Sequence, residues 1–162
     1  MSALLQWPTP EDERAKATHF LHAGHLFASA EPTIVTTVLG SCVAVCLWDD
    51  STGIGGLNHY LLPYRISEQS PSTRFGTLAI VQLIEKLETL GARRRGLRAK
   101  IFGGASMITP QTHRSPGRLN AEVALDLLRE SRIPVDATDV GGTRGRKLIF
   151  HTDTGEVLLR ML

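Results

Sequence analysis

The longest apolar stretch of the chain runs from residue 33 to residue 48, and it constrains the fold more than any other segment. Its residues are mainly Val, Ile, Leu and Thr, a composition that favours β-strands, and a Gly40-Ser41 pair interrupts it. We therefore predict two strands, 34–39 and 43–48, which meet at a tight corner. The stretch is shorter than the ~20 apolar residues of a membrane-spanning helix, so we expect no membrane insertion.

The rest of the chain predicts further strands and two helices. Apolar residues at helical spacing lead to Gly91, which suits the end of a helix, and a second helix should begin with Asn120 as its N-cap and run to about Ser131. The spaced residues are Leu78, Val81, Ile84, Leu87 and Leu90, and the other predicted strands are 54–62, 99–102, 147–151 and 157–161. Because strands predominate, we expect an α+β (mixed α/β) fold with layered β-sheets flanked by about two long helices.

The composition indicates one globular domain. The chain has 162 residues, of which 42% are apolar and 21% are charged. We expect residues 1–18 to form a polar, mobile leader and residues 19–162 to form a single folded domain. The leader carries an acidic run at 11–13 and does not resemble a signal peptide. With 18 Lys and Arg against 16 Asp and Glu, the net charge of +2 gives no argument for a nucleic-acid partner.

The chain has two cysteines, Cys42 and Cys46. On a strand they would lie roughly 13 Å apart, beyond the reach of a disulfide bond. Their number and spacing do not indicate the disulfide framework of a secreted protein, so we expect a cytoplasmic location. Cys46 would face the same side of the strand as Cys42, and core packing explains it better than a role beside Cys42.

Cys42 follows the Gly-Ser corner, and His59 lies 17 residues later, near the end of the next apolar segment. A thiol becomes a good nucleophile when a neighbouring base takes its proton, so these residues on adjacent strands would form a catalytic pair. A single cysteine in an apolar run is also a common small core residue. From the residues alone, both interpretations stay open.

Other polar residues give weaker candidates. His19, His22 and His25 are three residues apart, but in an extended segment His22 would face away from the other two, which disfavours a metal site. The Gly-Gly-Ala-Ser segment at 103–106 lacks the lysine of a phosphate-binding loop. We therefore expect neither a metal nor a cofactor.

Four blocks of the sequence occur in an order and with separations that identify a family. They read TIVTTVLGSCVAV (33–45), GGLNHYLLP (55–63), AKIFGGASM (99–107) and DVGGTRGR (139–146). Together they resemble the CheD family of chemoreceptor glutamine deamidases, and the resemblance covers roughly residues 20–162. It implies a CheD-like cysteine hydrolase scaffold. Thr143 stands where relatives frequently have asparagine.

The resemblance implies a set of catalytic residues. The catalytic cysteine of the family follows Gly-Ser, which places it on Cys42. The catalytic histidine precedes an apolar run that ends at proline, which places it on His59. The third residue of the family is a threonine six positions before the cysteine, which places it on Thr36. There it would hold the imidazole of His59 in one tautomer through its hydroxyl or its carbonyl.

The resemblance also implies a reaction and its partners. The protein would be a protein-glutamine glutaminase, an amide hydrolase that converts receptor glutamines to glutamate and ammonia through a Cys42 thioester. Its partners would be methyl-accepting chemotaxis receptors and a CheC-type phosphatase that competes for the same surface. Segments 64–76 and 110–117 would form the lips of the entrance to Cys42.

Two alternatives remain beside this interpretation. One is a thiol hydrolase with another substrate, such as a methylesterase that acts on receptors. The other is a non-catalytic regulator of a CheC-type phosphatase, in which Cys42 is only structural.

Overall fold

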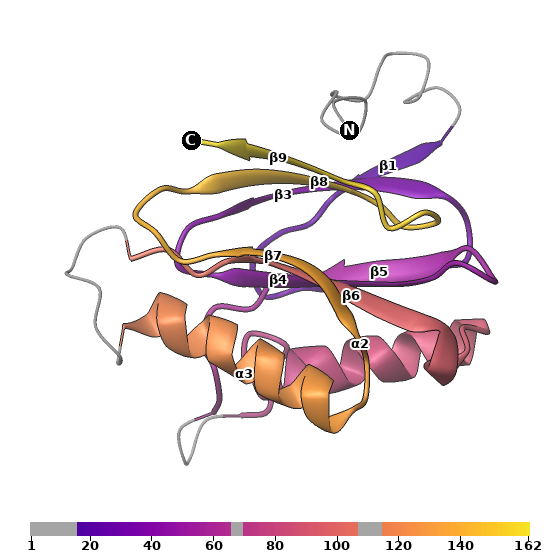
Figure 1. Cartoon of the computed structure of the whole chain (residues 1–162), viewed down its shortest axis with the longest axis horizontal. Helices are drawn as coiled ribbons and strands as arrows, with labels where there is room; N and C mark the ends of the chain where they lie inside the picture. The colour runs from indigo at the N-terminus through magenta and orange to yellow at the C-terminus, as the bar shows by residue number, and fades with distance from the viewer. Residues whose placement is uncertain (1–15, 66–69, 107–114) are drawn as a thin grey trace.

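The computed structural model describes residues 16–65, 70–106 and 115–162, which form three layers (Figure 1). A four-stranded sheet packs on one face of a five-stranded sheet, and two long helices cover the other face of the five-stranded sheet. The strands are β1 (Ala17–Phe20), β2 (Leu26–Ser29), β3 (Thr33–Leu39), β4 (Val43–Asp49), β5 (Ile54–Asn58), β6 (Leu97–Gly103), β7 (Val135–Val140), β8 (Arg146–His151) and β9 (Val157–Met161). The helices are α2 (Gly76–Leu90), α3 (Pro116–Glu130) and the short 3₁₀ helix η2 (Arg94–Gly96). The predicted mixed fold is confirmed.

The two sheets divide consecutive strands between them. One sheet has the order β1-β3-β8-β9, and the other has the order β2-β5-β4-β6-β7. The pairs β1–β3 and β6–β7 are parallel, and all other neighbours in the two sheets are antiparallel. β3 and β4 follow each other in the chain but lie in different sheets. The Gly40-Ser41 corner therefore carries the chain from one sheet to the other.

β4 is buried on both faces, which explains its continuous apolar sequence. Val43, Val45 and Leu47 contact the helix layer. Ala44 and Cys46 alternate with them and contact the four-stranded sheet. The central strand thus takes part in two separate cores.

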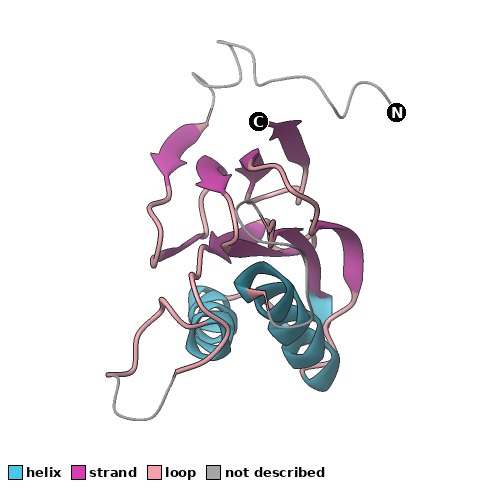
Figure 2. Cartoon of the chain, turned by 90° about the vertical axis from the view of Figure 1, so that its left-hand side faces the viewer, coloured by secondary structure: helices cyan, strands magenta, loops and turns pink. Residues whose placement is uncertain are grey.

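The two helices lie side by side beneath the five-stranded sheet (Figure 2). α2 ends at Leu90 and is capped by Gly91, which has a φ of 112° in the left-handed region and donates its backbone N–H to the Glu88 carbonyl (3.0 Å). α3 begins with Pro116, a residue suited to the first helical turn. In the part of the chain that the structure describes, no helix is long and apolar enough to cross a membrane.

The structure corrects several element boundaries. Asn120 was expected to start the second helix, but α3 begins at Pro116 and Asn120 lies within it. The predicted strand 54–62 ends at Asn58, because the Asn58 side chain accepts the Val45 N–H (2.9 Å) at the point where the regular ladder stops. β1, β2 and β7 were not predicted. β1 also begins at Ala17, inside the predicted leader, of which residues 1–15 lie outside the described residues.

Candidate active site

Cys42 lies at the corner between β3 and β4. Two backbone hydrogen bonds tie this corner to the loop after β6: the Gly104 N–H donates to the Cys42 carbonyl (2.9 Å), and the Ala105 N–H donates to the Gly40 carbonyl (3.0 Å). Cys42 is half-buried and packs against the core between the two sheets, whereas Ser41 is exposed. The corner therefore holds the thiol at the edge of the space between the sheets.

His59 lies just beyond the end of β5, yet strand pairing continues past it. Tyr60 exchanges two backbone hydrogen bonds with Val43, at 3.0 and 3.2 Å. This register places Ala44 opposite His59, with Cys42 as the diagonal neighbour of His59. Diagonal neighbours of this kind lie about 7–8 Å apart, which is within reach of long side chains.

The side chains of Cys42 and His59 point to the same face of the five-stranded sheet. Cys42 shares its face with Cys46, and His59 shares its face with Leu57, because residues two apart on a strand face the same way. Cys46 and Leu57 both belong to the core cluster between the sheets. The structure thus directs both predicted residues into the space between the sheets.

Thr37 on β3 holds the imidazole of His59 from the opposite sheet. Its Oγ1 lies 2.7 Å from Nδ1 of His59, and its hydroxyl donates to the Leu21 carbonyl (2.8 Å). A hydroxyl has one proton to donate, so Oγ1 must accept the Nδ1–H of His59. The neutral imidazole therefore carries its proton on Nδ1, and Nε2 is its basic nitrogen.

The hydrogen-bond partner of His59 is Thr37 and not Thr36, the residue that the family spacing predicts. Adjacent residues of a strand face opposite ways. Thr37 is fully buried between the sheets, whereas Thr36 shares the outer face of β3 with Val38, which is 45% exposed. The Thr36 carbonyl accepts the Leu21 N–H (2.9 Å). Thr36 thus steadies the backbone segment to which the Thr37 hydroxyl donates.

Burial sets the protonation states of the pair. It lowers the pKa of His59 to about 4. Burial also raises the pKa of the Cys42 thiol, and the hydrogen bond from the backbone N–H of the same residue opposes this shift only in part. Near pH 7 both groups are therefore neutral. A thiolate would form here only as Nε2 of His59 takes the proton during attack on a substrate.

Cys46 has a core environment. It is fully buried in the cluster between the two sheets, and its cross-strand partner is Leu57. Burial raises the pKa of Cys46 far above its ordinary value, so the thiol stays protonated. The expectation that Cys46 is a packing residue agrees with this environment.

The histidines at 19, 22 and 25 take part in packing and backbone contacts. The imidazole of His19 stacks on Phe27 with ring centroids 4.3 Å apart. The carbonyl of His25 accepts the His59 N–H (3.1 Å), which pairs the end of β5 with the segment before β2. Within residues 16–65, 70–106 and 115–162, no group of three or more His, Cys, Asp or Glu side chains is arranged to hold a metal ion.

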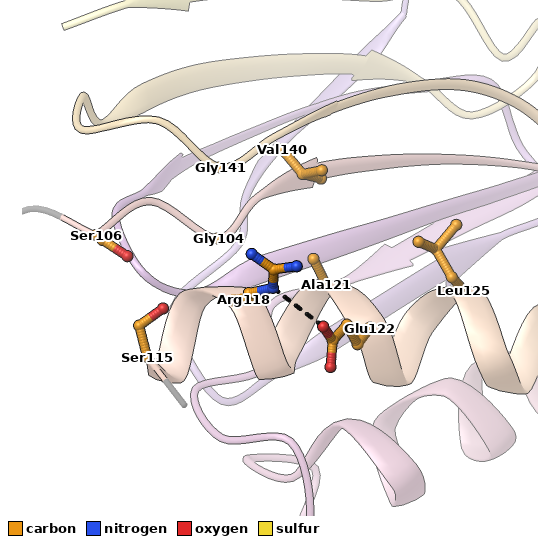
Figure 3. A pocket seen from close by; sticks show the side chains of 9 residues that line it. All are labelled: Gly104, Ser106, Ser115, Arg118, Ala121, Glu122, Leu125, Val140 and Gly141. Atoms are coloured by element: carbon orange, nitrogen blue, oxygen red, sulfur yellow. Dashed lines mark hydrogen bonds and ion pairs between the residues drawn. The ribbon is translucent and has the colours of Figure 1, made fainter. Parts of the chain in front are cut away.

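A cavity of about 270 Å³ lies between α3 and the ends of β6 and β7 (Figure 3). Gly104 and Gly141 border it on the side of the sheet, and Arg118 and Glu122 of α3, paired at 3.2 Å, border it on the side of the helices. Neither Cys42 nor His59 lines this cavity. Of the residues that line it, Gly104 also contacts the Cys42 corner, because its N–H donates to the Cys42 carbonyl.

The predicted lips of the entrance lie only partly within the described residues, since 66–69 and 107–114 fall outside them. Beside the described part of segment 64–76, a second cavity of about 350 Å³ borders the first turns of α2. It is lined by Arg65, Pro71, Ser72, Phe75, Thr77, Leu78 and Val81. The role of both segments as lips stays a prediction.

Sequence reasoning missed two residues at this site. Thr37 falls on the same strand face as Val35 and Leu39, and this alternation identifies it as inward-facing once β3 is recognised. Asn120 was interpreted as an N-cap, but it is a fully buried residue inside α3. Asparagine is unfavourable within a helix, which is the signal that this position has a special role.

A comparison with protein families identifies the chain. The family model described as CheD chemotactic sensory transduction matches residues 61–161. The chain belongs to the CheD family. The matched region begins after His59, but relatives align over a longer part of the chain. A protein from Anaeromyxobacter dehalogenans is 53% identical over 148 residues, which cover 91% of this chain and 86% of the relative. The predicted family resemblance is confirmed.

Two other CheD relatives show similar coverage. A protein from Sulfurimonas denitrificans is 43% identical over 87% of this chain and 92% of its own length. One from Trichlorobacter lovleyi is 46% identical over 87% of this chain and 88% of its own length. All three relatives bear the name probable chemoreceptor glutamine deamidase.

One solved structure resembles this CheD protein only distantly. It is the crystal structure of Neisseria meningitidis protein NMB0706, which belongs to the family model DUF152. The TM-score is 0.46 at 9% sequence identity, over 82% of this chain and 66% of that chain.

Proposed function

We propose that this CheD protein is a chemoreceptor glutamine deamidase, which hydrolyses the side-chain amide of receptor glutamines to glutamate and ammonia in bacterial chemotaxis. The names of its relatives support this activity. The observation that carries the proposal is the series of hydrogen bonds from His59 through Thr37 to the Leu21 carbonyl. It makes Nε2 the basic nitrogen on the sheet face that also carries Cys42, as a cysteine hydrolase requires.

The first half of the reaction forms a thioester. Nε2 of His59 takes the proton of the Cys42 thiol as the sulfur attacks the carboxamide carbon of the substrate glutamine. A carbon–sulfur bond forms, and the carbonyl π electrons move to the oxygen. The imidazolium then gives its proton to the amide nitrogen, the carbon–nitrogen bond breaks, and ammonia leaves.

The second half of the reaction restores the enzyme. His59, again neutral, takes a proton from a water molecule that attacks the thioester carbon. The carbon–sulfur bond breaks, the Cys42 sulfur recovers a proton from the imidazolium, and glutamate is released. The Thr37 hydroxyl keeps the Nδ1–H in place through both halves, so the same nitrogen serves as base and acid each time.

The backbone of the Cys42 corner is suited to stabilise the oxyanion. The backbone N–H of Cys42 lowers the pKa of the thiol, which burial otherwise raises. A carbonyl carbon bonded to that sulfur would place its oxygen near the same N–H. Backbone N–H groups in such positions stabilise tetrahedral intermediates in acyl transfer. We assign this function to the N–H of Cys42.

Mass spectrometry of a purified receptor cytoplasmic fragment tests the proposal. Wild-type protein should raise the mass of selected glutamine-containing peptides by the difference between an NH₂ and an OH group, with release of ammonia. Cys42→Ala and His59→Ala should each abolish the change. Loss of methanol from methylated receptor without deamidation would instead identify a methylesterase.

A CheC-type phosphatase is a second partner that we propose, together with a cytoplasmic location. It would occupy the receptor-binding surface and inhibit deamidation. The alternative of a non-catalytic regulator would be supported if wild-type protein bound such a phosphatase but left receptor glutamines unchanged. Deamidation that declines as phosphatase is added would support the enzyme and the shared surface together.

A further inference from the structure

Asn120 connects the segment after β5, which carries the proposed base, with the corner that carries the proposed nucleophile. Its side-chain Nδ2 donates to the Ser41 carbonyl (3.0 Å) and to the Leu61 carbonyl (2.9 Å). Ser41 directly precedes Cys42, and Leu61 lies two residues after His59. One amide group from α3 therefore holds the two main-chain segments next to the reacting side chains.

Asn120 is itself fixed in place. It is fully buried, and its backbone carbonyl accepts a hydrogen bond from the Tyr60 hydroxyl. The start of α3 also packs closely on the loop after β6, because a Cβ on Gly117 would lie 2.5 Å from the carbonyl oxygens of Gly104 and Ala105. The amide of Asn120 is thus carried by a helix that packs closely on the loop beside the corner.

The position of Asn120 is not explained by packing alone. Asparagine is unfavourable inside a helix, and Oδ1 of Asn120 is buried without a hydrogen-bond partner in the described part of the chain. Both amide protons have backbone acceptors, and an alanine here would leave the Ser41 and Leu61 carbonyls without this donor. Asn120 thus donates hydrogen bonds to two carbonyls of the site, while its own Oδ1 has no partner in the described part of the chain.

We propose that Asn120 is a positioning residue that sets the separation between Sγ of Cys42 and Nε2 of His59. The catalytic consequence rests on the proposed function, whereas the effect on the reactivity of the thiol does not. The distance and orientation of two reacting groups must be held closely, and a misplacement of about 1 Å can lower a rate by roughly 10²-fold. The hydrogen bonds from Asn120 to the Ser41 and Leu61 carbonyls fix the two backbone segments and thereby this distance.

A double-mutant cycle in the alkylation rate of Cys42 tests the proposal. Iodoacetamide is applied at pH 7 to the full-length wild type, Asn120→Ala, His59→Ala and the double variant, with Cys42 and Cys46 distinguished by fragmentation. Asn120→Ala should slow alkylation about 10-fold in the wild-type background but less than about twofold in the His59→Ala background. A structural role would slow both backgrounds equally.

The control is Ala124→Gly, which alters another fully buried residue of α3 and weakens the helix. It should leave alkylation within about twofold of wild type. On receptor, Asn120→Ala should lower kcat by about 10–100-fold and change KM less than about threefold. If Asn120→Ala does not fold, Asn120→Leu, which suits a helix, fills more of the volume and has no N–H donor in its side chain, takes its place in the cycle.

Two results would overturn the positioning role. One is an alkylation rate for the Asn120 variant within about twofold of wild type, and the other is an equal slowing with and without His59. The proposed function fails separately, if wild-type protein leaves receptor glutamines unchanged. In that case the alkylation cycle still decides whether Asn120 positions the pair.

Discussion

The space between the two sheets holds one cysteine at its edge and one in its interior. Both side chains pack in the core between the sheets, Cys46 from β4 and Cys42 from the corner just before β4. Cys42 at the edge is half-buried and has His59 as its diagonal neighbour, whereas Cys46 in the interior is fully buried opposite Leu57. Burial raises both thiol pKa values, but far more for Cys46. The place along the strand, and not the residue type, therefore decides whether a thiol meets both a base and a substrate.

Removal of the edge thiol should have the largest effect. Cys42→Ala should lower kcat/KM for receptor deamidation by roughly 10⁴-fold or more, because no other group can form the thioester. The measurement is ammonia release together with peptide masses. Retention of more than about a tenth of the activity would show that Cys42 is not the nucleophile.

Acid should lower the free energy of unfolding of the protein through protonation of His59. The pKa of His59 is lowered from 6.5 to about 4 in the folded chain. Between these values the unfolded chain binds a proton that the folded chain does not, so the stability present above pH 6.5 declines as the pH falls toward 4. The loss from this group amounts to about 3 kcal/mol.

The measurement is denaturant unfolding from pH 7 to pH 4 for the wild type and His59→Gln. The variant should lose less stability over this range, and the difference isolates His59 from the other histidines. Because His59 stays neutral down to about pH 4, the acid limb of kcat/KM in the wild type should lie well below pH 6. An acid limb near 6.5 would contradict the burial of the imidazole.

The two adjacent threonines of β3 give a matched pair of variants, which tests which of them orients His59. Thr37→Val should lower kcat by about 10–100-fold, because His59 loses the acceptor that fixes its tautomer. Thr36→Val should stay within about twofold of wild type, since only its carbonyl takes part in the site. Steady-state kinetics on receptor compare the two, and a greater loss for Thr36→Val would support the assignment of Thr36 from the family spacing.

Shortening the interior cysteine should have the smallest effect on activity. Cys46→Ala should keep kcat/KM within about twofold of wild type and lower the free energy of unfolding by about 1–2 kcal/mol, because it leaves a small cavity between the sheets. Thermal unfolding and deamidation of the same preparation check both numbers. A loss of activity as large as that of Cys42→Ala would remove the distinction between edge and interior.

Much of the fold was predictable because its strongest signals are local. β3, β4 and the two long helices show their apolar patterns, continuous in β4 and spaced in the helices, within a short window of sequence. The three missed strands, β1, β2 and β7, all lie at sheet edges, and β1 is exposed along its whole length. Edge strands of this kind are held mainly by pairing with a neighbour that lies elsewhere in the chain. Their own sequences therefore carry little signal.

The candidate site was predictable in its chemistry but not in its full geometry. The motif around Cys42 and the histidine after it identified the pair. The sequence did not indicate that the Gly40-Ser41 corner changes sheets, which brings Thr37 over His59 from the other side. The prediction of Asn120 as an N-cap was wrong, because an asparagine side chain can either cap a helix or, when buried, donate hydrogen bonds to distant backbone carbonyls. Both errors concern contacts between segments that are distant in the sequence.

The hydrogen bond between Thr37 and His59 joins residues that belong to different sheets. A shear of one sheet over the other by about an ångström would leave every strand intact but lengthen this bond beyond its useful range. The imidazole would then be able to turn over and present the wrong nitrogen to Cys42. The catalytic rate of this protein would thus depend on the relative position of the two sheets. Under mild heat or pressure, the rate should fall before circular dichroism records any loss of secondary structure.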